Sequence, residues 1–354
     1  MSEAPLAGRL AAPARVRRVL ICEDSKTFAA GLTRLLTRDH DIEVVAVCET
    51  AEQAIARLPA LKPDLVTMDL ELPGMSGVAA IEQIMSVLPL PILVLSGHVE
   101  RRSETALMAL AAGALDAVPK NGLDILDPDG LSAKALRARV KLLSGVKVIR
   151  HPRARLTNAR PPSAWVRPAS AIGIVASTGG PQALAAVLAD IPATFAVPIF
   201  VVQHISSGFG EGFASWLDGQ VPLPVRLATP GATVGPGIWV APDGAHTVLR
   251  STGFGVDRTT QGLHCPSGDV LLRSIATAAG AHGVAVVLTG MGRDGAEGLA
   301  AVQRAGGLTI AQDAATCAVY GMPKAAAELG AGLVLPLAGV APRLRALRAV
   351  GLVR

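Results

Sequence analysis

Short aliphatic runs alternate with segments of helical periodicity between residues 16 and 145, and this alternation restricts the fold more than any other feature of the chain. Each run has the length of a buried strand, and each segment between two runs is long enough for a helix. Strands that alternate with helices form a parallel sheet with helices on both faces. We expect strands at 16–22, 42–47, 65–68, 92–95 and 116–118, helices that begin near Lys26, Ala51, Ser76 and Ser103, and a last helix at 132–143.

The same rhythm resumes near Ala169 and continues through the C-terminal half of the chain. We therefore expect an α/β protein with two doubly wound parallel-sheet domains, which agrees with 354 residues at roughly 100–200 residues per domain. The first domain is expected at 16–145 and the second at 169–354. A flexible N-terminal tail at 1–15 and a basic linker rich in proline and arginine at 146–168 account for the rest.

Charge is distributed unevenly along the chain, although the net charge is +5. Residues 1–130 carry a net charge of −6, whereas residues 131–189 carry +10 and contain no acidic residue. Prolines and weak apolar periodicity in the basic segment are typical of an exposed linker between domains. A nucleic-acid arm is the alternative, but aromatic residues make up 3% of the chain, which argues against base stacking and a nucleic-acid partner.

Composition also bears on the class of protein. The chain is 50% hydrophobic, so disorder is excluded as its main state. It has no long uncharged apolar run and no signal-peptide pattern, so membrane insertion is not expected. The four cysteines are scattered and form no C-x-x-C pair, which is typical of reduced thiols rather than of disulfides or a zinc site. We expect a cytoplasmic protein and a monomer.

Polar groups follow four of the expected strands in the first domain. Glu23 and Asp24 follow the first strand, Asp69 the third, Ser96 the fourth and Lys120 the fifth. Ligands of parallel sheets bind at the carboxyl ends of the strands, so these groups converge. Carboxylates bind Mg²⁺, a carboxylate can accept a phosphoryl group, and a hydroxyl and an ammonium can hold phosphate oxygens. One acid after a strand often caps a helix, but all five groups together predict a phosphorylation site.

This region resembles the receiver domain of two-component response regulators, which has a flavodoxin-like fold. The matching residues are Glu23-Asp24, Asp69 in MDLELPGMSG, Ser96 in VLSG and Lys120 in AVPK. The chain departs from the family's pattern at Ala117, where an aromatic switch residue is usual, and at Asn121, where a proline usually follows the lysine.

The resemblance to receivers implies roles for the strand-end groups. A histidine kinase would phosphorylate Asp69, and Ser96 and Lys120 would sense the phosphate. A Mg²⁺ ion required for this phosphorylation would be held by Glu23, Asp24, Asp69 and a backbone carbonyl near Glu71.

In the second domain a serine, a histidine and an aspartate each follow an expected strand. Ser177 ends AIGIVAS before a tight glycine turn, His204 ends PIFVVQH, and Asp294 lies in the glycine-rich loop GMGRDG after VAVVLT. A serine hydroxyl becomes nucleophilic at neutral pH when an imidazole takes its proton and a carboxylate orients that imidazole. Since parallel strand ends face the same way, the sequence predicts a Ser177, His204 and Asp294 triad.

The residues of the second domain also permit other interpretations. His246, His264 and His282 are rival bases on spacing alone. The STGGP turn and the GMGRDG loop could bind an anion at a helix start. G-x-S-x-G is absent, and the chain order Ser, His, Asp differs from that of α/β-hydrolases. A response regulator whose C-terminal domain binds a partner or an anion without catalysis is therefore the alternative.

Residues 170–351 look like the catalytic domain of the chemotaxis protein-glutamate methylesterase (CheB) family, a Rossmann-like α/β esterase domain. The matching stretches are ASTGGP, VVQHISSGFGEGFASWL, PGIWVAPDGAHTVL, HCPSGDVLLRS, VVLTGMGRDGAEGL and TIAQDAATCAVYGMPKAA. The resemblance implies that Ser177 is the nucleophile, His204 the base and Asp294 the orienting acid. It further implies that the oxyanion site is lined by Thr178 and Met291.

A receiver in front of this domain is also that family's architecture. The combined resemblance implies phosphorylation-activated hydrolysis of glutamate γ-methyl esters on methyl-accepting chemoreceptors, with deamidation of particular receptor glutamines, in chemotaxis adaptation. Mg²⁺ would serve the receiver, and the ester reaction would need no cofactor. The expected partners are the receptors and the chemotaxis histidine kinase. The family's usual VQHMP is VQHIS here, so Ile205 and Ser206 alter the entrance.

Overall fold

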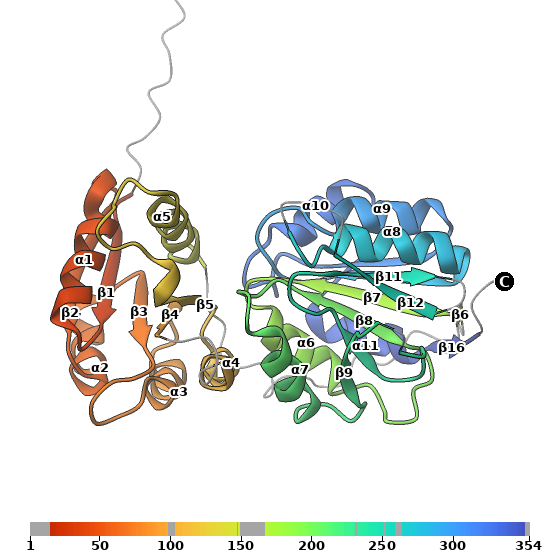
Figure 1. The fold of residues 1–354 in the computed structure, drawn as a ribbon, viewed down its shortest axis with the longest axis horizontal. Coiled ribbons are helices and arrows are strands. Elements are labelled where there is room, and N and C mark those ends of the chain that lie inside the picture. The colour runs from red at the N-terminus through yellow and green to blue at the C-terminus, as the bar shows by residue number, and fades with distance from the viewer. Residues whose placement is uncertain are drawn as a thin grey trace, which may run out of the picture.

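The computed structural model describes residues 15–97, 103–146, 148, 167–230, 232–250, 253–258 and 264–350. They form two α/β domains with helix α4 between them (Figure 1). The expected N-terminal tail, apart from Arg15, and most of the expected linker at 146–168 fall outside the described residues. In the part of the chain that is described, no helix has the length and apolar character needed to cross a bilayer.

The first domain contains a parallel sheet of five strands in the order β2-β1-β3-β4-β5. Its strands are β1 (Arg17–Cys22), β2 (Ile42–Cys48), β3 (Leu65–Asp69), β4 (Ile92–Ser96) and β5 (Asp116–Pro119). Its helices are α1 (Lys26–Leu36), α2 (Ala51–Leu61), α3 (Gly77–Val87), α4 (Ser103–Ala112) and α5 (Leu131–Leu143), with 3₁₀ turns η1 (Thr37–Asp39) and η2 (Lys120–Gly122). Helices α1 and α5 pack together on one face, and α2, α3 and α4 lie on the other.

Helices α1, α2 and α3 begin close to the expected residues because their preceding residues cap them. The side-chain oxygens of Ser25, Thr50 and Ser76 each accept a hydrogen bond from the backbone N–H three residues later, all at 3.3 Å. Such caps satisfy N–H groups that have no partner within the helix. Strands β3 and β4 are buried along their whole length, as expected of strands covered on both faces.

The second domain contains a parallel sheet of seven strands in the order β15-β14-β13-β7-β8-β10-β9. These strands are β7 (Ala171–Ala176), β8 (Ile199–Gln203), β9 (Val225–Leu227), β10 (Ile238–Val240), β13 (Gly283–Val287), β14 (Leu308–Gln312) and β15 (Leu333–Leu335). Two small sheets are formed by β11 (His246–Arg250) with β12 (Gly253–Asp257) and by β6 (Arg167–Ala169) with β16 (Leu347–Ala349). The prediction of two doubly wound parallel-sheet domains is confirmed.

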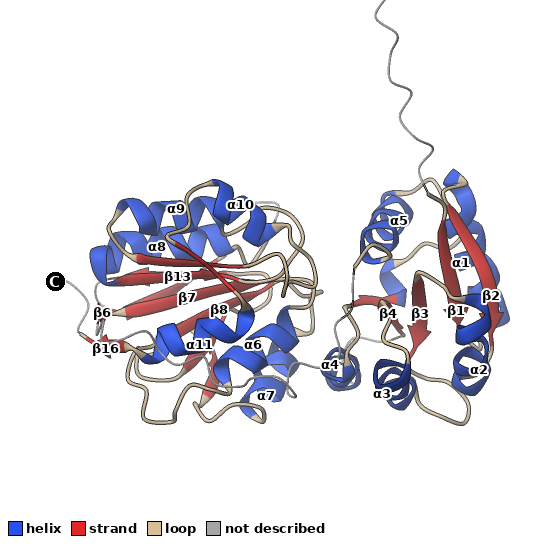
Figure 2. Ribbon diagram, turned by 180° about the vertical axis from the view of Figure 1, so that it is seen from behind, coloured by secondary structure: helices blue, strands red, loops and turns tan. Residues whose placement is uncertain are grey.

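Helices cover both faces of the large sheet (Figure 2). One face carries α6 (Gly180–Leu188), α7 (Gly210–Asp218) and α11 (Leu337–Arg345). The other carries α8 (Gly268–Ala279), α9 (Ala296–Arg304) and α10 (Met322–Glu328), and the 3₁₀ turn η4 (Gly280–His282) precedes β13. Buried strands β7, β8 and β13 lie side by side at the centre, so the loops after them share one edge of the sheet.

Candidate active site

The three predicted triad residues follow three neighbouring strands. Ser177 comes directly after β7, His204 directly after β8, and Asp294 lies in the loop between β13 and α9. These strands are parallel and adjacent in the order β13-β7-β8, so their carboxyl ends open onto one edge. The backbone N–H of Ser177 donates to the carbonyl of Thr289 at 3.0 Å, which ties the β7 and β13 loops together.

His204 and Asp294 form a buried hydrogen-bonded pair. Nε2 of His204 lies 2.7 Å from Oδ2 of Asp294, and their side chains are 13% and 6% exposed. With Nε2–H donating to the carboxylate, Nδ1 of His204 keeps the lone pair that can accept a proton. A carboxylate that fixes the tautomer of an imidazole in this way is the arrangement a serine nucleophile requires.

Asp294 is itself held at the start of helix α8. It accepts hydrogen bonds from the hydroxyl of Ser267 at 2.8 Å, from the N–H of Gly268 at 2.6 Å and from the N–H of Asp269 at 3.0 Å. Burial raises the pKa of Asp294, but the hydrogen bonds from His204 and from these backbone N–H groups outweigh burial and hold its pKa well below the usual range. Asp294 therefore stays ionised at all pH values at which the protein is expected to work.

The depressed pKa of Asp294 makes its contribution to stability depend on pH. A carboxyl group whose pKa falls on folding stabilises the protein above its unfolded pKa of about 4, and this stabilisation is lost as the pH falls through the folded pKa. We expect Asp294→Asn to lower the free energy of unfolding by about 2 kcal/mol at pH 7 and by less at pH 3. Urea unfolding of both proteins at the two pH values measures this, with the exposed Asp190→Asn as the control. An equal loss at both pH values would contradict it.

The structure distinguishes His204 from the three other histidines that the sequence offers as candidate bases. His282 precedes β13 and so lies at the opposite edge of the sheet. His246 is 1% exposed, and its Nδ1 accepts a hydrogen bond from the N–H of Ser267 at 3.1 Å, so it supports the α8 cap. His264 stacks on the ring of His204 with ring centroids 4.5 Å apart and an interplanar angle of 11°.

The environment of the stacked His264 ring favours its neutral form. Partial desolvation and the neighbouring imidazole of His204 lower the pKa of His264, which favours its neutral form. A neutral ring covers one face of His204 without repelling the charge that His204 would gain as a base. The sequence contains no signal for this stacking beyond the position of His264 in HCPSGD.

Close backbone approach shapes the surroundings of Ser177. A Cβ at Gly290 would lie 2.7 Å from the Cβ of Ser177, so the β13 loop can pass here with glycine alone. Among the described residues, no backbone carbonyl accepts a hydrogen bond from the N–H of Thr178 or of Met291. The assignment of these two N–H groups to an oxyanion site stays a prediction.

A buried hydrogen-bond network that the sequence did not reveal supports the turn at Thr178. The hydroxyl of Thr289 donates to the carbonyl of Thr178 at 3.0 Å and accepts from the N–H of Val319 at 2.9 Å. The N–H of Thr289 donates to Oε1 of Gln312, which is fully buried at the end of β14. A buried, fully bonded amide of this kind holds the Thr178 turn in one conformation.

The strand ends of the first domain bring the predicted phosphorylation residues together. Nζ of Lys120 lies 2.6 Å from Oδ2 of Asp69 and 2.6 Å from Oε2 of Glu23. Burial raises the pKa of Glu23, whereas the ion pairs with Asp69 and Glu23 outweigh the burial of Lys120 and raise its pKa. Lys120 also lies over the ring of Phe28, 4.8 Å from its centroid, a contact that the sequence did not reveal.

This cluster suits a hard divalent cation and a phosphoryl group. Carboxylate oxygens of Glu23, Asp24 and Asp69 lie within 4.8 Å of one another, and oxygen atoms are the ligands that Mg²⁺ prefers. The hydroxyl of Ser96 is buried and has no partner among the described residues, so it can bond an added phosphate oxygen. The residues therefore fit a Mg²⁺ ion and a phosphorylated Asp69.

Comparisons with known proteins give one family match for each of the two domains. The CheB methylesterase family matches residues 172–344, and the response regulator receiver domain family matches residues 19–126. Protein-glutamate methylesterase/protein-glutamine glutaminase 3 of Myxococcus xanthus (strain DK1622) is 43% identical over 317 residues, which cover 89% of this chain and 88% of the relative. The chain belongs to the CheB methylesterase family.

Further relatives cover both domains or one of them. Protein-glutamate methylesterase/protein-glutamine glutaminase 3 of Anaeromyxobacter dehalogenans (strain 2CP-C) is 42% identical and covers 92% of this chain and 98% of its own. The crystal structure of the Thermotoga maritima CheB methylesterase catalytic domain has a TM-score of 0.49 at 36% identity and covers 50% of this chain and 97% of its own. After the two family matches, we call the first domain the receiver and the second the esterase domain.

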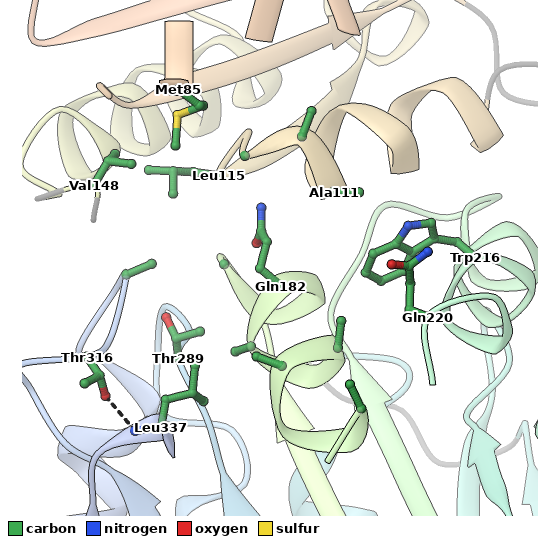
Figure 3. Close-up of a pocket in the computed structure, with 18 of the residues that line it drawn as sticks. Met85, Ala111, Leu115, Val148, Gln182, Trp216, Gln220, Thr289, Thr316 and Leu337 are labelled. Carbon is green, nitrogen blue, oxygen red and sulfur yellow. Dashed lines mark hydrogen bonds between the residues drawn. The ribbon is translucent and has the colours of Figure 1, made fainter. Parts of the chain in front are cut away.

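The receiver contacts the esterase domain beside Ser177, through residues that the sequence did not single out. The N–H of Gly179 donates to the carbonyl of Leu115 at 3.2 Å, and the hydroxyl of Ser206 donates to the carbonyl of Ala117 at 3.3 Å. Helix α4 packs against α7 and α6, and the side-chain amide of Gln182 on α6 points toward the receiver (Figure 3). Two of the positions that depart from the family patterns, Ala117 and Ser206, thus meet at this interface.

Proposed function

We propose that the chain hydrolyses glutamate γ-methyl esters on methyl-accepting chemoreceptors, deamidates particular receptor glutamines, and is activated by phosphorylation of its receiver by the chemotaxis histidine kinase. One observation carries the proposal: the hydrogen-bonded pair of His204 and Asp294 lies at the sheet edge where Ser177 follows the neighbouring strand, in a chain of the methylesterase family. The proposal includes a monomer that works in the cytoplasm, where kinase and receptor methylation sites are expected to meet.

The proposed mechanism uses the three residues in sequence. Nδ1 of His204 takes the hydroxyl proton of Ser177, and the ionised Asp294 stabilises the imidazolium that forms. Attack on the ester carbonyl gives a tetrahedral oxyanion, which the N–H groups of Thr178 and Met291 stabilise. The imidazolium of His204 then protonates the methoxy oxygen as its bond to the carbonyl carbon breaks, so methanol leaves and the acyl-enzyme forms. Water, activated by His204, hydrolyses the acyl-enzyme to glutamate and free Ser177. This chemistry needs no cofactor.

In the receiver, Asp69 is the proposed phosphoacceptor. Mg²⁺ would be held by Glu23, Asp24 and Asp69. It would neutralise the negative charge of these carboxylates and of the phosphoryl oxygens. The buried hydroxyl of Ser96 and the ammonium of Lys120 support the proposal, since both can bond phosphate oxygens. Phosphate would thus add negative charge at the end of β3, beside Lys120, which follows the β5 segment that contacts the esterase domain.

The contact between the domains offers a way for phosphorylation to act. Leu115 and Ala117, whose carbonyls accept hydrogen bonds from the esterase domain, lie within five residues of Lys120 along the chain. A shift of β5 toward a phosphate on Asp69 would strain both bonds. Within the described residues no ion pair joins the two domains, so the contact depends on hydrogen bonds and apolar packing.

Loss of the hydrogen bond from Ser206 should weaken this contact. We expect Ser206→Ala to raise hydrolysis by the unphosphorylated chain about two- to tenfold, because one neutral hydrogen bond contributes about 0.5–1.5 kcal/mol. The phosphorylated rate should change little. Initial rates of methanol release measure both, and Ser207→Ala, an exposed neighbour, is the matched control. Equal unphosphorylated rates for Ser206→Ala and the wild type would contradict a restraining role of this hydrogen bond.

The proposed function as a whole is tested by methanol release from methylated receptor membranes, with and without a small phosphodonor and Mg²⁺. We expect release that increases with the phosphodonor. A serine-directed phosphonate should label Ser177 in the same preparation. A chain that releases no methanol and leaves Ser177 unlabelled would instead be a regulator whose C-terminal domain binds a partner or an anion without catalysis.

A further inference from the structure

Gln203, the last residue of β8, connects the loop that carries Ser177 to the loop that carries His204. Its side chain is buried, and its amide nitrogen Nε2 donates to the carbonyl of Ser177 at 2.8 Å and to the carbonyl of His204 at 2.9 Å. Because both partners are carbonyl oxygens, the nitrogen of the amide must face them. One buried amide therefore holds the backbone of the proposed nucleophile and that of the proposed base.

The other backbone groups of these two residues are also bonded. The N–H of Ser177 donates to the carbonyl of Thr289 at 3.0 Å, and the carbonyl of Ser177 accepts a second hydrogen bond from the N–H of Gly180 at 2.7 Å. The N–H of His204 donates to the carbonyl of Ala176, at the end of β7, at 2.9 Å. With the two bonds of the buried amide, both backbone polar groups of each residue have partners, so the direction of each Cα–Cβ bond is fixed.

The oxygen of the same amide accounts for the second glycine of STGGP. Oε1 of Gln203 is buried and has no hydrogen-bond partner among the described residues. A Cβ at Gly180, the first residue of α6, would overlap with this oxygen, so glycine leaves the space that the amide occupies. An unbonded buried oxygen costs free energy that an apolar side chain would avoid. Stability alone thus does not explain an amide at this position.

The backbone determines how the two reacting side chains face each other. In the part of the chain that the structure describes, no hydrogen bond joins the hydroxyl of Ser177 to the imidazole of His204. A base must come within about 3 Å of the proton that it takes. Without a direct bond between the two side chains, their separation depends on the loops that carry them, and these loops are joined by Gln203.

We propose that Gln203 is a positioning residue for ester hydrolysis, whose amide sets the separation of the Ser177 hydroxyl and the His204 imidazole by holding the carbonyls of both residues. This inference rests on the proposed function, in which these two side chains react with the ester. The amide of Gln203 is buried and bonded to backbone, so it acts through the two side chains and not on the ester itself.

The Gln203→Met variant keeps a long side chain and removes both donors. With saturating phosphodonor we expect its kcat for methylated receptor to be about tenfold lower than that of the wild type, with KM within about twofold. A misplacement of about 1 Å can cost about 100-fold, and a smaller shift is expected here because the N–H of Gly180 still holds the carbonyl of Ser177. Labelling of Ser177 by the serine-directed phosphonate should slow by the same factor but reach the same final stoichiometry.

The experiment measures methanol release, phosphonate labelling and urea unfolding of each full-length chain. Val201→Ala is the matched control, because Val201 is fully buried on the same strand and the same face as Gln203, and its apolar side chain makes no hydrogen bond to either loop. This control should lower the free energy of unfolding but keep kcat and the labelling rate within about twofold of the wild type.

A second variant tests the same contact while it retains the amide. In Gly180→Ala the added Cβ would displace Oε1 of Gln203, so kcat and the labelling rate should again fall at full final stoichiometry. A folded Gly180→Ala chain with the kcat of the wild type would overturn the inference, whatever the result for Gln203→Met.

The remaining outcomes separate positioning from stability and from the function itself. An unchanged kcat in Gln203→Met would overturn the inference. A final labelling stoichiometry that falls in proportion to kcat, an equal loss of kcat in Val201→Ala, or a Gln203→Met chain that does not fold would make Gln203 a residue of stability alone, and would also overturn it. A wild-type chain that releases no methanol from receptor and leaves Ser177 unlabelled would instead refute the proposed function.

Discussion

Replacing Ser177 by alanine is expected to lower kcat for receptor ester hydrolysis by about 10⁴-fold or more, with the fold retained. The hydroxyl is the proposed nucleophile, and in a serine triad the loss of the nucleophile removes nearly all of the contribution of the triad. His204→Ala should cause a loss of similar size, because without an imidazole the hydroxyl keeps its proton. Methanol release at saturating receptor measures both variants, and circular dichroism shows whether the fold is retained.

The double variant tests whether the residues act as one unit. Residues that act together show strongly non-additive losses, so Ser177→Ala/His204→Ala should be about as slow as either single variant. A double variant that is far slower than both single variants would mean that Ser177 and His204 contribute independently, and the triad proposal would fail. Ser207→Ala, an exposed serine three residues after His204, is the control and should keep activity within about twofold.

The Asp69→Asn variant is expected to abolish activation by phosphodonor, the second-largest effect. In the wild type we expect phosphodonor and Mg²⁺ to raise the rate by about 10–100-fold. Hydrogen bonds from Gly179, Ser206 and Gln182 hold the receiver against the esterase domain. Each such bond contributes about 0.5–1.5 kcal/mol, so loss of a few of them accounts for a rise in rate of this size. The variant should keep the unphosphorylated rate in all conditions and take up no label from radioactive phosphodonor.

Removal of the cation gives an independent check on the same step. With EDTA the wild type should show neither labelling nor activation, because the clustered carboxylates of Glu23, Asp24 and Asp69 would then repel the incoming phosphoryl group. The unphosphorylated rate should stay the same, since the ester reaction as proposed involves no metal. Activation that persists in Asp69→Asn would show that phosphate acts elsewhere. A drop of the unphosphorylated rate in EDTA would contradict a metal-free esterase reaction.

Local sequence patterns predicted much of the fold and the identity of the candidate residues. The aliphatic runs and the caps at Ser25, Thr50 and Ser76 depend on residues a few positions apart, so the sequence itself indicates where strands end and helices begin. A polar residue that directly follows a buried parallel strand lies at the binding edge of the sheet. Ser177 and His204 both satisfy this rule, although it does not exclude the other histidines.

The sequence by itself thus determined two α/β domains and a set of strand-end groups, and it left four histidines as candidate bases. The tertiary structure favours His204, because it places β8 beside β7 and β13, pairs His204 with Asp294 and stacks His264 on His204. It also decided that the receiver carbonyl of Leu115 meets the N–H of Gly179. The physical reason is that strand order and domain contact arise from packing between residues far apart in the chain, for which no local periodicity exists.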